Sequence, residues 1–299
     1  MAASTTHAGF LFLWLLFAST FHLGSCSLKP HCCEMEKHAL LIFKKSVIDP
    51  TFSLFSWSVQ KDCREWVGVQ CDNIIGGVIS LDLGFTGFEW KLLPSYEFMR
   101  FECVSQLVKN YVSSFMWKFL QPQYLDLSYN VNLHINDIQW ISHFPSLKSL
   151  HLNGINMHKE IHWIQRISWP PYLSELVLRS CQLADIIPSV GWFVNFSSLQ
   201  SLDLSENHFD FEVSKLVSNL SDQISAIILE SNKLKGPIPD TLRSLRNRKY
   251  WMLGGNELNG TIPGWFGEYK HLWELEFYGN SLQGSIPATI ENLSSLGGV

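Results

Sequence analysis

Two histidines and a glutamate in the stretch HKEIH are the first residues whose types suggest chemistry. His158 and His162 lie four residues apart with Glu160 between them, and such residues commonly bind metal ions. The order is H-x-E-x-H, however, whereas zinc proteases use H-E-x-x-H on a helix. The stretch also lies in a connecting segment before Trp163. We therefore predict no metal site here and no cofactor in the chain.

Carboxylates and aromatic residues near the C-terminus form a second candidate set. Paired carboxylates hydrolyse glycosides when an apolar pocket raises the pKa of one of them, but the sequence indicates no such pocket. Phosphate-binding loops and the G-x-S-x-G nucleophile motif are also absent, so we predict no enzymatic activity. Aromatic side chains often anchor protein interfaces. We therefore predict docking of a peptide or protein ligand with basic character, the alternative being ordinary solvated positions; the set is Glu230, Lys249, Tyr250, Trp273, Glu274, Glu276 and Tyr278.

The elements that would position this set come from a repeated phrase. SNKLKGPIP (231–239), GNELNGTIP (255–263) and GNSLQGSIP (279–287) follow one another at steps of 24 residues. The template L-x-x-L-x-L-x-x-N-x-L fits the chain seven times at near-constant spacing, and a further match would begin at Leu296. Its first positions are Pro122, Leu147, Leu173, Leu199, Ile224, Arg248 and Leu272. Repeats of this length stack into an α/β solenoid with a parallel, concave β-sheet.

Each position of the template has a physical role. The alternating L-x-L pair predicts a strand with one buried face. The following Asn turns the chain, because its amide both donates and accepts hydrogen bonds. Cys181 occupies this Asn position, so we predict a structural role for it. Trp140, Trp192 and Trp265 each lie seven residues before the next repeat, which predicts packing on the returning side of the coil.

The first residues indicate secretion. Residues 1–26 are predicted to be a signal peptide, because an apolar run is followed by small residues, although the leader lacks Lys and Arg. No later run is long enough for a transmembrane helix. Secretion agrees with four predicted N-glycosylation acceptors, which are Asn195, Asn219, Asn259 and Asn292. The net charge of −5 and the pI near 6.1 argue against a nucleic-acid partner, which needs a basic face.

Residues 27–77 are predicted to form an N-terminal cap, which a solenoid needs to cover its first coil. Within EMEKHALLIFKKSV, one helical face carries Ala39, Phe43 and Val47. Four cysteines of the cap are predicted to form disulfides in an oxidising compartment, and sequence alone allows three pairings; they are Cys32, Cys33, Cys63 and Cys71.

The cap sequence CCEMEKHALLIFKKSVIDP, followed by SWSVQKDCREWVGVQCDN, resembles the cap of plant leucine-rich-repeat receptor proteins. The stretch LKSLHLNGINMHKEIHWIQRISWPPYLSELVLRSCQL resembles the receptor-like proteins of the group that includes the ethylene-inducing xylanase receptors. The resemblance implies an extracellular ligand-recognition domain, a membrane helix elsewhere in the full-length protein and signalling through co-receptor kinases. It implies a place at the plasma membrane in defence or developmental signalling. The alternative is a secreted inhibitor of microbial cell-wall-degrading enzymes that uses the same cap and solenoid.

Three features depart from the family pattern. The resemblance implies that Cys63 pairs with Cys32, but Arg64 replaces the usual partner of Cys71, for which Cys33 is a possible substitute. Within residues 78–121, which we assign to the first repeat and an irregular segment, residues 91–121 do not fit the template. A deletion or faulty gene model and a tolerated insert are both open explanations. Residues 122–299 carry the remaining repeats and stop as a new one begins, which we read as a truncated receptor.

Overall fold

The computed structural model describes residues 33–90, 121–135, 137–167, 170–183, 196–217, 220, 223–245 and 248–297. The strands are β1 (Val47–Ile48), β2 (Val69–Cys71), β3 (Val78–Asp82), β4 (Glu89–Trp90), β5 (Tyr124–Asp126), β6 (Ser149–His151), β7 (Glu175–Val177), β8 (Ser201–Asp203), β9 (Ala226–Ile228), β10 (Lys235–Pro237), β11 (Tyr250–Met252), β12 (Glu257–Asn259) and β13 (Glu274–Glu276). The α-helices are α2 (Glu34–Ser46), α5 (Trp163–Ile167) and α6 (Val213–Val217). Short 3-10 helices are η1 (Cys63–Glu65), η2 (Gln139–His143), η3 (Asp240–Ser244), η4 (Gly264–Glu268) and η5 (Ala288–Asn292).

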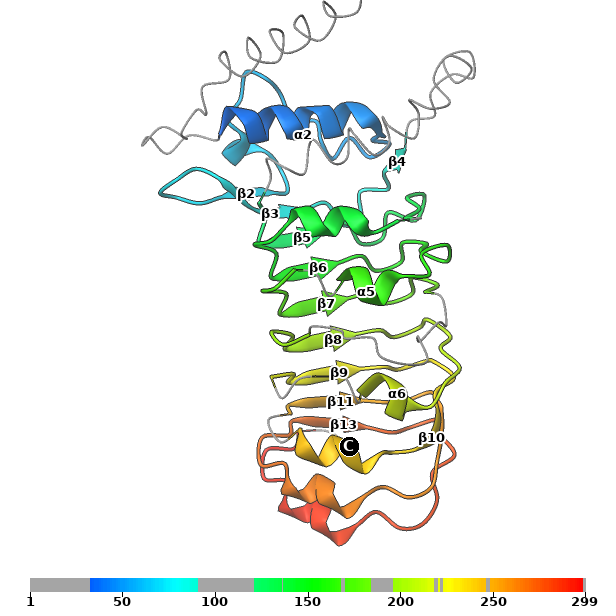
Figure 1. Ribbon diagram of the computed structural model, residues 1–299. Helices are drawn as coiled ribbons and strands as arrows, with labels where there is room; N and C mark the ends of the chain where they lie inside the picture. Colours follow the sequence, from blue (N-terminus) through cyan, green and yellow to red (C-terminus); the bar gives the residue numbers. More distant parts are fainter. Residues whose placement is uncertain are drawn as a thin grey trace, which may run out of the picture.

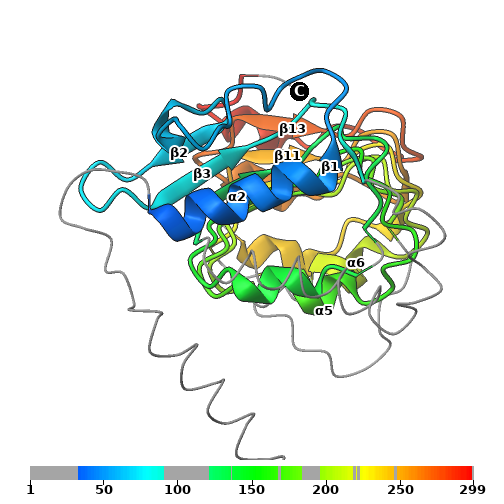
Figure 2. The ribbon, with the colours of Figure 1, turned by 90° about the horizontal axis from the view of Figure 1, so that it is seen from above.

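The predicted solenoid is confirmed. Nine strands form one sheet in the order β13-β11-β9-β8-β7-β6-β5-β3-β2, and all neighbours are parallel except β2 and β3. Figure 1 shows these strands stacked like rungs, with α2 across one end. Viewed along the stack, the sheet forms one side of each coil, and α5 and α6 lie on the opposite side (Figure 2).

The core fills the inside of the coils with the template's apolar residues. The strand leucines Leu150, Leu176 and Leu202 are buried in consecutive repeats. All seven first positions of the template are buried as well. Arg248 is fully buried in a position that usually holds leucine, so the stacking of the coils fixes this position even where the residue type is unfavourable.

The Asn at the end of each strand bridges two coils. Asn232 Nδ2 donates to the carbonyl oxygens of Leu204 (3.1 Å) and Leu229 (3.0 Å). Its Oδ1 accepts from the backbone amides of Asn207 and Phe209, both at 3.1 Å. One buried side chain thus satisfies four backbone groups, which would otherwise be costly to bury. Equivalent bonds are made by Asn130, Asn207, Asn256 and Asn280.

Cys181 has the predicted structural role. It is fully buried, and its Sγ donates to the carbonyl oxygen of Leu152 at 3.0 Å. Burial raises the pKa of this thiol to about 12, so the thiol keeps its proton at neutral pH. A thiol replaces the donor half of the Asn amide in this repeat.

Tryptophan packs on the side of the coil opposite the sheet, as predicted. Trp140 lies in η2 and packs edge-on against Phe144, the residue that follows this helix. Trp265 lies in η4, is buried and donates through Nε1 to Asp240 at 2.9 Å. The third predicted position, Trp192, lies outside the described residues.

The cap covers the first coil with the predicted helical face. Ala39, Phe43 and Val47 are at most 3% exposed. Beneath α2, the rings of Trp57 and Trp66 stack at a centroid distance of 5.2 Å. Burial of this apolar face closes the end of the stack, because an open coil end would leave the core exposed to water.

Of the cap cysteines, Cys63 is in a disulfide bond, as the resemblance implies, whereas Cys71 is not. Cys63 is fully buried and disulfide-bonded; Cys32, its expected partner, lies outside the described residues. Cys71 carries a free thiol whose sulfur lies 3.7 Å from that of Cys63, and it is not joined to Cys33. Burial raises the pKa of the Cys71 thiol to about 11. The substitute pair Cys33–Cys71 is therefore not formed in the structure.

Residues 91–120, together with the predicted signal peptide, lie outside the described residues. The sheet nevertheless continues in register from β3 to β5: Ser80 pairs with Tyr124, and Asp82 pairs with Asp126. None of the described helices is long and apolar enough to cross a membrane.

We expect Asn232→Ala to lower the free energy of unfolding by at least about 2 kcal/mol, because it leaves buried backbone groups without partners. Urea unfolding measures this loss. Asn73→Ala, at an exposed turn of the cap, is the matched control and should have little effect. Equal effects of the two substitutions would contradict the bridging role.

A second prediction concerns Glu36, whose carboxylate accepts from the backbone amide of Val78 at 3.1 Å inside the cap. Burial raises the pKa of this carboxyl from 4.5 to about 7. The folded state therefore holds the proton more tightly, so stability from this group is full below about pH 4.5 and is lost as the pH rises through 7. In the wild-type chain, this loss should lower the free energy of unfolding by at most about 3 kcal/mol. We expect Glu36→Gln to abolish this pH-dependent loss.

Urea unfolding between pH 4 and pH 8 tests this expectation. Glu34→Gln is the control, since Glu34 lies in the same helical turn with its side chain 86% exposed. An unchanged pH profile in Glu36→Gln would show that the buried carboxyl does not control it.

Candidate functional site

The exposed side of the nine-stranded sheet, here called the sheet face, is the candidate site. Side chains alternate along each strand, so residues that flank the buried leucines point outward. The parallel register then aligns equivalent residues of successive repeats in columns: Glu175 beside Ser201, and Val177 beside Asp203. Neighbouring repeats thus bring together residues that are about 25 positions apart in the sequence.

Three of the seven predicted binding residues meet at one end of the strands. The Tyr278 hydroxyl donates to Glu230 Oε1 at 3.2 Å across two repeats. Glu276 lies within hydrogen-bonding reach of Glu230, and this hydrogen bond is the main reason why the pKa of Glu276 is raised above its usual value. The negative charge of Glu230 likewise raises the pKa of the Tyr278 phenol. Glu274 adds a further negative charge next to Glu276.

A glycine permits this arrangement. The Tyr278 ring lies over Gly254, where an added Cβ would come within 2.7 Å of the ring atoms Cδ1 and Cζ. Any larger residue at position 254 would push the ring away from Glu230. The close approach therefore depends on Gly254.

The other predicted residues lie near the opposite ends of the strands. Lys249 is exposed and Tyr250 is half-buried. Trp273 is 57% exposed, and its backbone amide donates to the Lys249 carbonyl oxygen at 2.8 Å. With Tyr278 at 61% exposure, the two ends of β13 present two large aromatic surfaces, and Glu274 and Glu276 lie between them along the chain.

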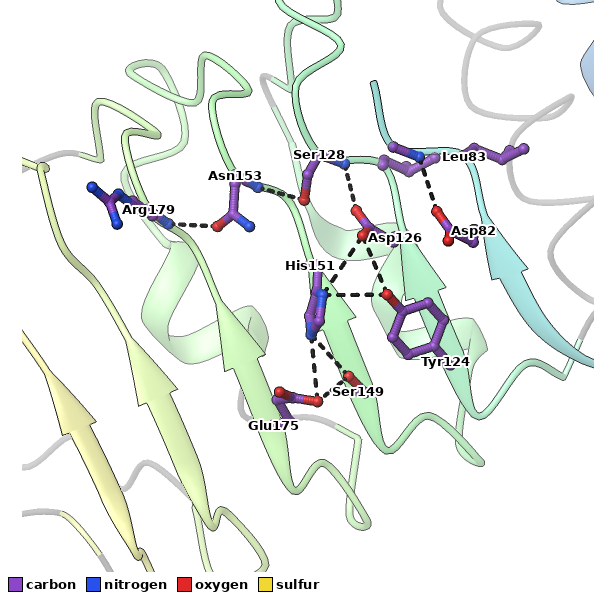
Figure 3. A network of polar contacts seen from close by, with 12 residues as sticks. Asp82, Leu83, Tyr124, Asp126, Ser128, Ser149, His151, Asn153, Glu175 and Arg179 are labelled. Atoms are coloured by element: carbon purple, nitrogen blue, oxygen red, sulfur yellow. Dashed lines mark hydrogen bonds and ion pairs between the residues drawn. The ribbon is translucent and has the colours of Figure 1, made fainter. Parts of the chain in front are cut away.

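A polar network in the N-terminal half of the sheet face was missed by sequence reasoning. Figure 3 shows His151 on β6 between Asp126 and Tyr124 of β5 and Glu175 of β7. His151 Nδ1 lies 3.6 Å from Asp126 Oδ2, and Nε2 lies 3.4 Å from Glu175 Oε2. Ser149 Oγ lies 3.1 Å from the same Nε2.

Ser149, His151 and Asp126 are the residue types of a nucleophilic triad. Their hydrogen bonds, however, differ from those that such a triad needs. The Ser149 hydroxyl donates to Glu175 Oε2 at 2.6 Å, so its proton is directed away from the imidazole that would have to accept it. The arrangement is that of a structural and electrostatic network. The repeat template already indicated that Tyr124, Ser149 and Glu175 are neighbours, since they occupy equivalent positions of consecutive repeats.

The two acidic regions of the sheet face are separated by an ion pair. The Arg179 guanidinium pairs with the Glu206 carboxylate, which also accepts from the Ser180 hydroxyl. The hydrogen bond to Glu206 raises the pKa of Arg179, while those from Ser180 and Arg179 lower the pKa of Glu206. The Arg179–Glu206 pair therefore neutralises part of the charge in this part of the surface.

The HKEIH stretch has a structural role. Glu160 is buried and accepts from the backbone amides of Ile138 (2.7 Å) and His162 (2.8 Å) and from Arg166 Nη1 (2.8 Å). Within the described part of the chain, no group of three His, Cys, Asp or Glu residues is arranged to hold a metal ion.

Two of the predicted glycosylation acceptors, Asn259 and Asn292, are exposed. Asn195 and Asn219 lie outside the described residues. Glycosylation itself stays a prediction.

Comparison with known proteins supports the interpretation of the fold. The family model of the leucine-rich-repeat N-terminal domain matches residues 33–72, and that of the leucine-rich repeat matches residues 198–220 and 271–293. The chain belongs to the leucine-rich-repeat proteins. It is 30% identical to the tomato (Solanum lycopersicum) receptor-like protein EIX1 over 83% of its own length and 29% identical to EIX2 over 86%.

These relatives confirm the resemblance to plant receptor-like proteins. The chain spans 29% of the length of each of the two tomato receptors. Among solved structures, the Arabidopsis receptor kinase HAESA, in complex with the peptide hormone IDA and the co-receptor SERK1, matches with a TM-score of 0.65 and 22% identity. This match covers 88% of the chain and 45% of HAESA. A plant ice-binding protein matches with a TM-score of 0.54 and 22% identity, covering 90% of the chain and 73% of that protein, so the solenoid alone does not specify a function.

We expect Gly254→Ala to displace the Tyr278 ring and lower the pKa of its phenol toward the ordinary value, because the ring loses its contact with Glu230. Titration of the Tyr278 resonance by NMR measures the change. Gly77→Ala is the control, since a Cβ there meets only ordinary contacts at 3.8 Å. A phenol pKa that is unchanged in Gly254→Ala would mean that the ring does not need the glycine.

Proposed function

We propose that this leucine-rich-repeat chain is the ligand-recognition ectodomain, or part of one, of a plant cell-surface receptor-like protein. The ligand would be an extracellular peptide or protein with basic character, and it would dock on the sheet face at β9, β11 and β13. The observation that carries the proposal is the hydrogen bond of exposed Tyr278 to Glu230, next to Glu276, with exposed Trp273 at the opposite end of β13. Aromatic residues beside several negative charges favour a ligand that carries positive charge.

The structure offers a physical reason for a basic ligand. Glu276 lies so close to Glu230 that the pKa of Glu276 is raised, and a cation bound beside the two carboxylates would offset the repulsion between their negative charges. An arginine or lysine side chain would supply that cation. Tyr278, already oriented by Glu230, would then provide a fixed aromatic surface beside it.

The comparisons suggest how recognition would lead to a signal. HAESA was solved in complex with a peptide hormone and a co-receptor, and the receptor RGFR1 was solved in complex with RGF2. By analogy, the chain would act at the outer side of the plasma membrane and signal in defence or development through partner kinases. It needs no enzymatic activity of its own, because binding alone would bring the partners together.

Binding of fluorescein-labelled hexapeptides to the purified chain tests the proposal. One peptide alternates arginine with glycine, and its counterpart alternates glutamate with glycine. We expect the arginine peptide to bind more tightly, and we expect the combined change of Tyr250, Trp273 and Tyr278 to Ala to weaken its binding about tenfold or more.

The control changes three exposed aromatic residues outside the sheet face, Phe52, Phe55 and Tyr172, to Ala. Equal binding by the folded Tyr250, Trp273 and Tyr278 variant would eliminate this docking site. Failure of the wild-type chain to prefer the arginine peptide would eliminate the basic ligand.

A further inference from the structure

The imidazole of His151 is surrounded by oxygen atoms on both sides. Nδ1 lies 3.4 Å from the Tyr124 hydroxyl and 3.6 Å from Asp126 Oδ2. Nε2 lies 3.1 Å from the Ser149 hydroxyl and 3.4 Å from Glu175 Oε2. These neighbours come from β5, β6 and β7, so one ring contacts three consecutive repeats (Figure 3).

Both neighbouring hydroxyl groups donate their hydrogen bonds to carboxylates. The Tyr124 hydroxyl donates to Asp126 Oδ2 at 3.2 Å, and the Ser149 hydroxyl donates to Glu175 Oε2 at 2.6 Å. Each ring nitrogen of His151 therefore meets only acceptors. A neutral imidazole has one N–H donor and the imidazolium ion has two, so only the protonated ring satisfies both sides.

We propose that His151 is a proton-operated link across β5, β6 and β7: when protonated it bridges Asp126 and Glu175, and when it loses the proton it leaves this half of the sheet face with two uncompensated carboxylates. Loss of the proton makes the surface more negative by one elementary charge. The proton thus controls both the local cohesion of three repeats and the charge that a ligand would meet.

The charged surroundings support the bridge. The Asp126 carboxylate from β5 and the Glu175 carboxylate from β7 face the ring directly, and Tyr124 from β5 packs edge-on against it at a centroid distance of 5.2 Å. Asp82 on β3 adds negative charge near Tyr124. The side chains of His151 and Asp126 are only 18% and 15% exposed, so solvent screens their attraction less than at an open surface.

The balance of these effects favours the protonated form. Burial alone would lower the pKa of His151, but the hydrogen bond to Asp126 and the charges of Glu175 and Asp126 raise it above 6.5. A folded-state pKa above the unfolded value means that the contribution of His151 to stability is present at acidic pH and is lost as the pH rises through the folded pKa.

The consequence for ligand binding rests on the proposed function. A basic peptide on the sheet face would gain attraction when His151 loses its proton. One additional charge at roughly 10 Å in water changes the affinity about twofold. The effect on the His151 region itself does not depend on any ligand.

NMR titration of the full chain, labelled with ¹³C at histidine, tests the link. His151→Gln identifies the resonance, and His271→Gln, at an exposed turn, is the matched control. We expect the His151 resonance to titrate above pH 6.5 and its midpoint to fall in both Asp126→Asn and Glu175→Gln. Unfolding by urea should also show a stability loss as the pH rises above 6.5, which His151→Gln reduces and His271→Gln retains.

A midpoint at or below 6.5, or one that is unchanged in Glu175→Gln, would overturn the proposal. Glu175 is 43% exposed, so Glu175→Gln decides the question even if Asp126→Asn does not fold. Arginine-peptide binding at pH 5.5 and pH 8 separates this inference from the proposed function. Absence of binding at both pH values contradicts only the docking proposal, whereas binding whose pH dependence is the same in His151→Gln contradicts the link's effect on the ligand.

Discussion

The buried asparagine that joins one coil to the next is the interaction on which the rest of the structure depends. A strand that turns sharply inside a solenoid leaves backbone amides and carbonyls away from water, and each needs a partner. Asn207 and Asn232 supply those partners to their own coil and to the preceding one. The same bonds fix the spacing between strands, so the leucines of successive repeats meet in one continuous core.

The backbone conformation at these turns follows from the same constraint. The residue before the asparagine adopts a positive φ, 59° at Tyr129, 57° at Glu206 and 62° at Gly279. Such a conformation is uncommon for residues other than glycine, and here the turn and the hydrogen bonds of the asparagine maintain it. Since the asparagines and leucines hold the coil together from inside, most residues on the sheet face are free of the constraints that the core imposes. They can therefore carry charge and aromatic surface suited to recognition.

The two halves of that face use charge differently. Around Glu230, two carboxylates and a phenol lie close together. Around His151, two carboxylates surround a ring that neutralises part of their charge when it is protonated. The Arg179–Glu206 pair lies between them. We therefore propose a basic partner for one half of the face and a response to pH for the other.

Much of the fold follows from the sequence because the template specifies it locally. The asparagine positions, the leucine pairs and the amphipathic face of α2 each have one low-energy arrangement, so the pattern determines the structure. The free thiol of Cys71 was not predictable, because it depends on the distance between turns of the cap. The bend of Tyr278 over Gly254 also requires side-chain geometry that no spacing rule contains. The residues around His151 were predictable as neighbours, but the donor and acceptor roles that make the ring a link appear only with coordinates.

The pairing of β3 with β5 has a consequence for how such a protein changes over evolutionary time. Ser80 and its partner Tyr124 are 44 positions apart, whereas Tyr124 and its partner Ser149 are 25 apart. Both pairs have the same parallel register. The length of the chain between two neighbouring strands therefore does not determine how the strands are aligned. Sequence changes over evolutionary time can therefore alter the length of a connection between two strands while the residues of the other repeats keep their places.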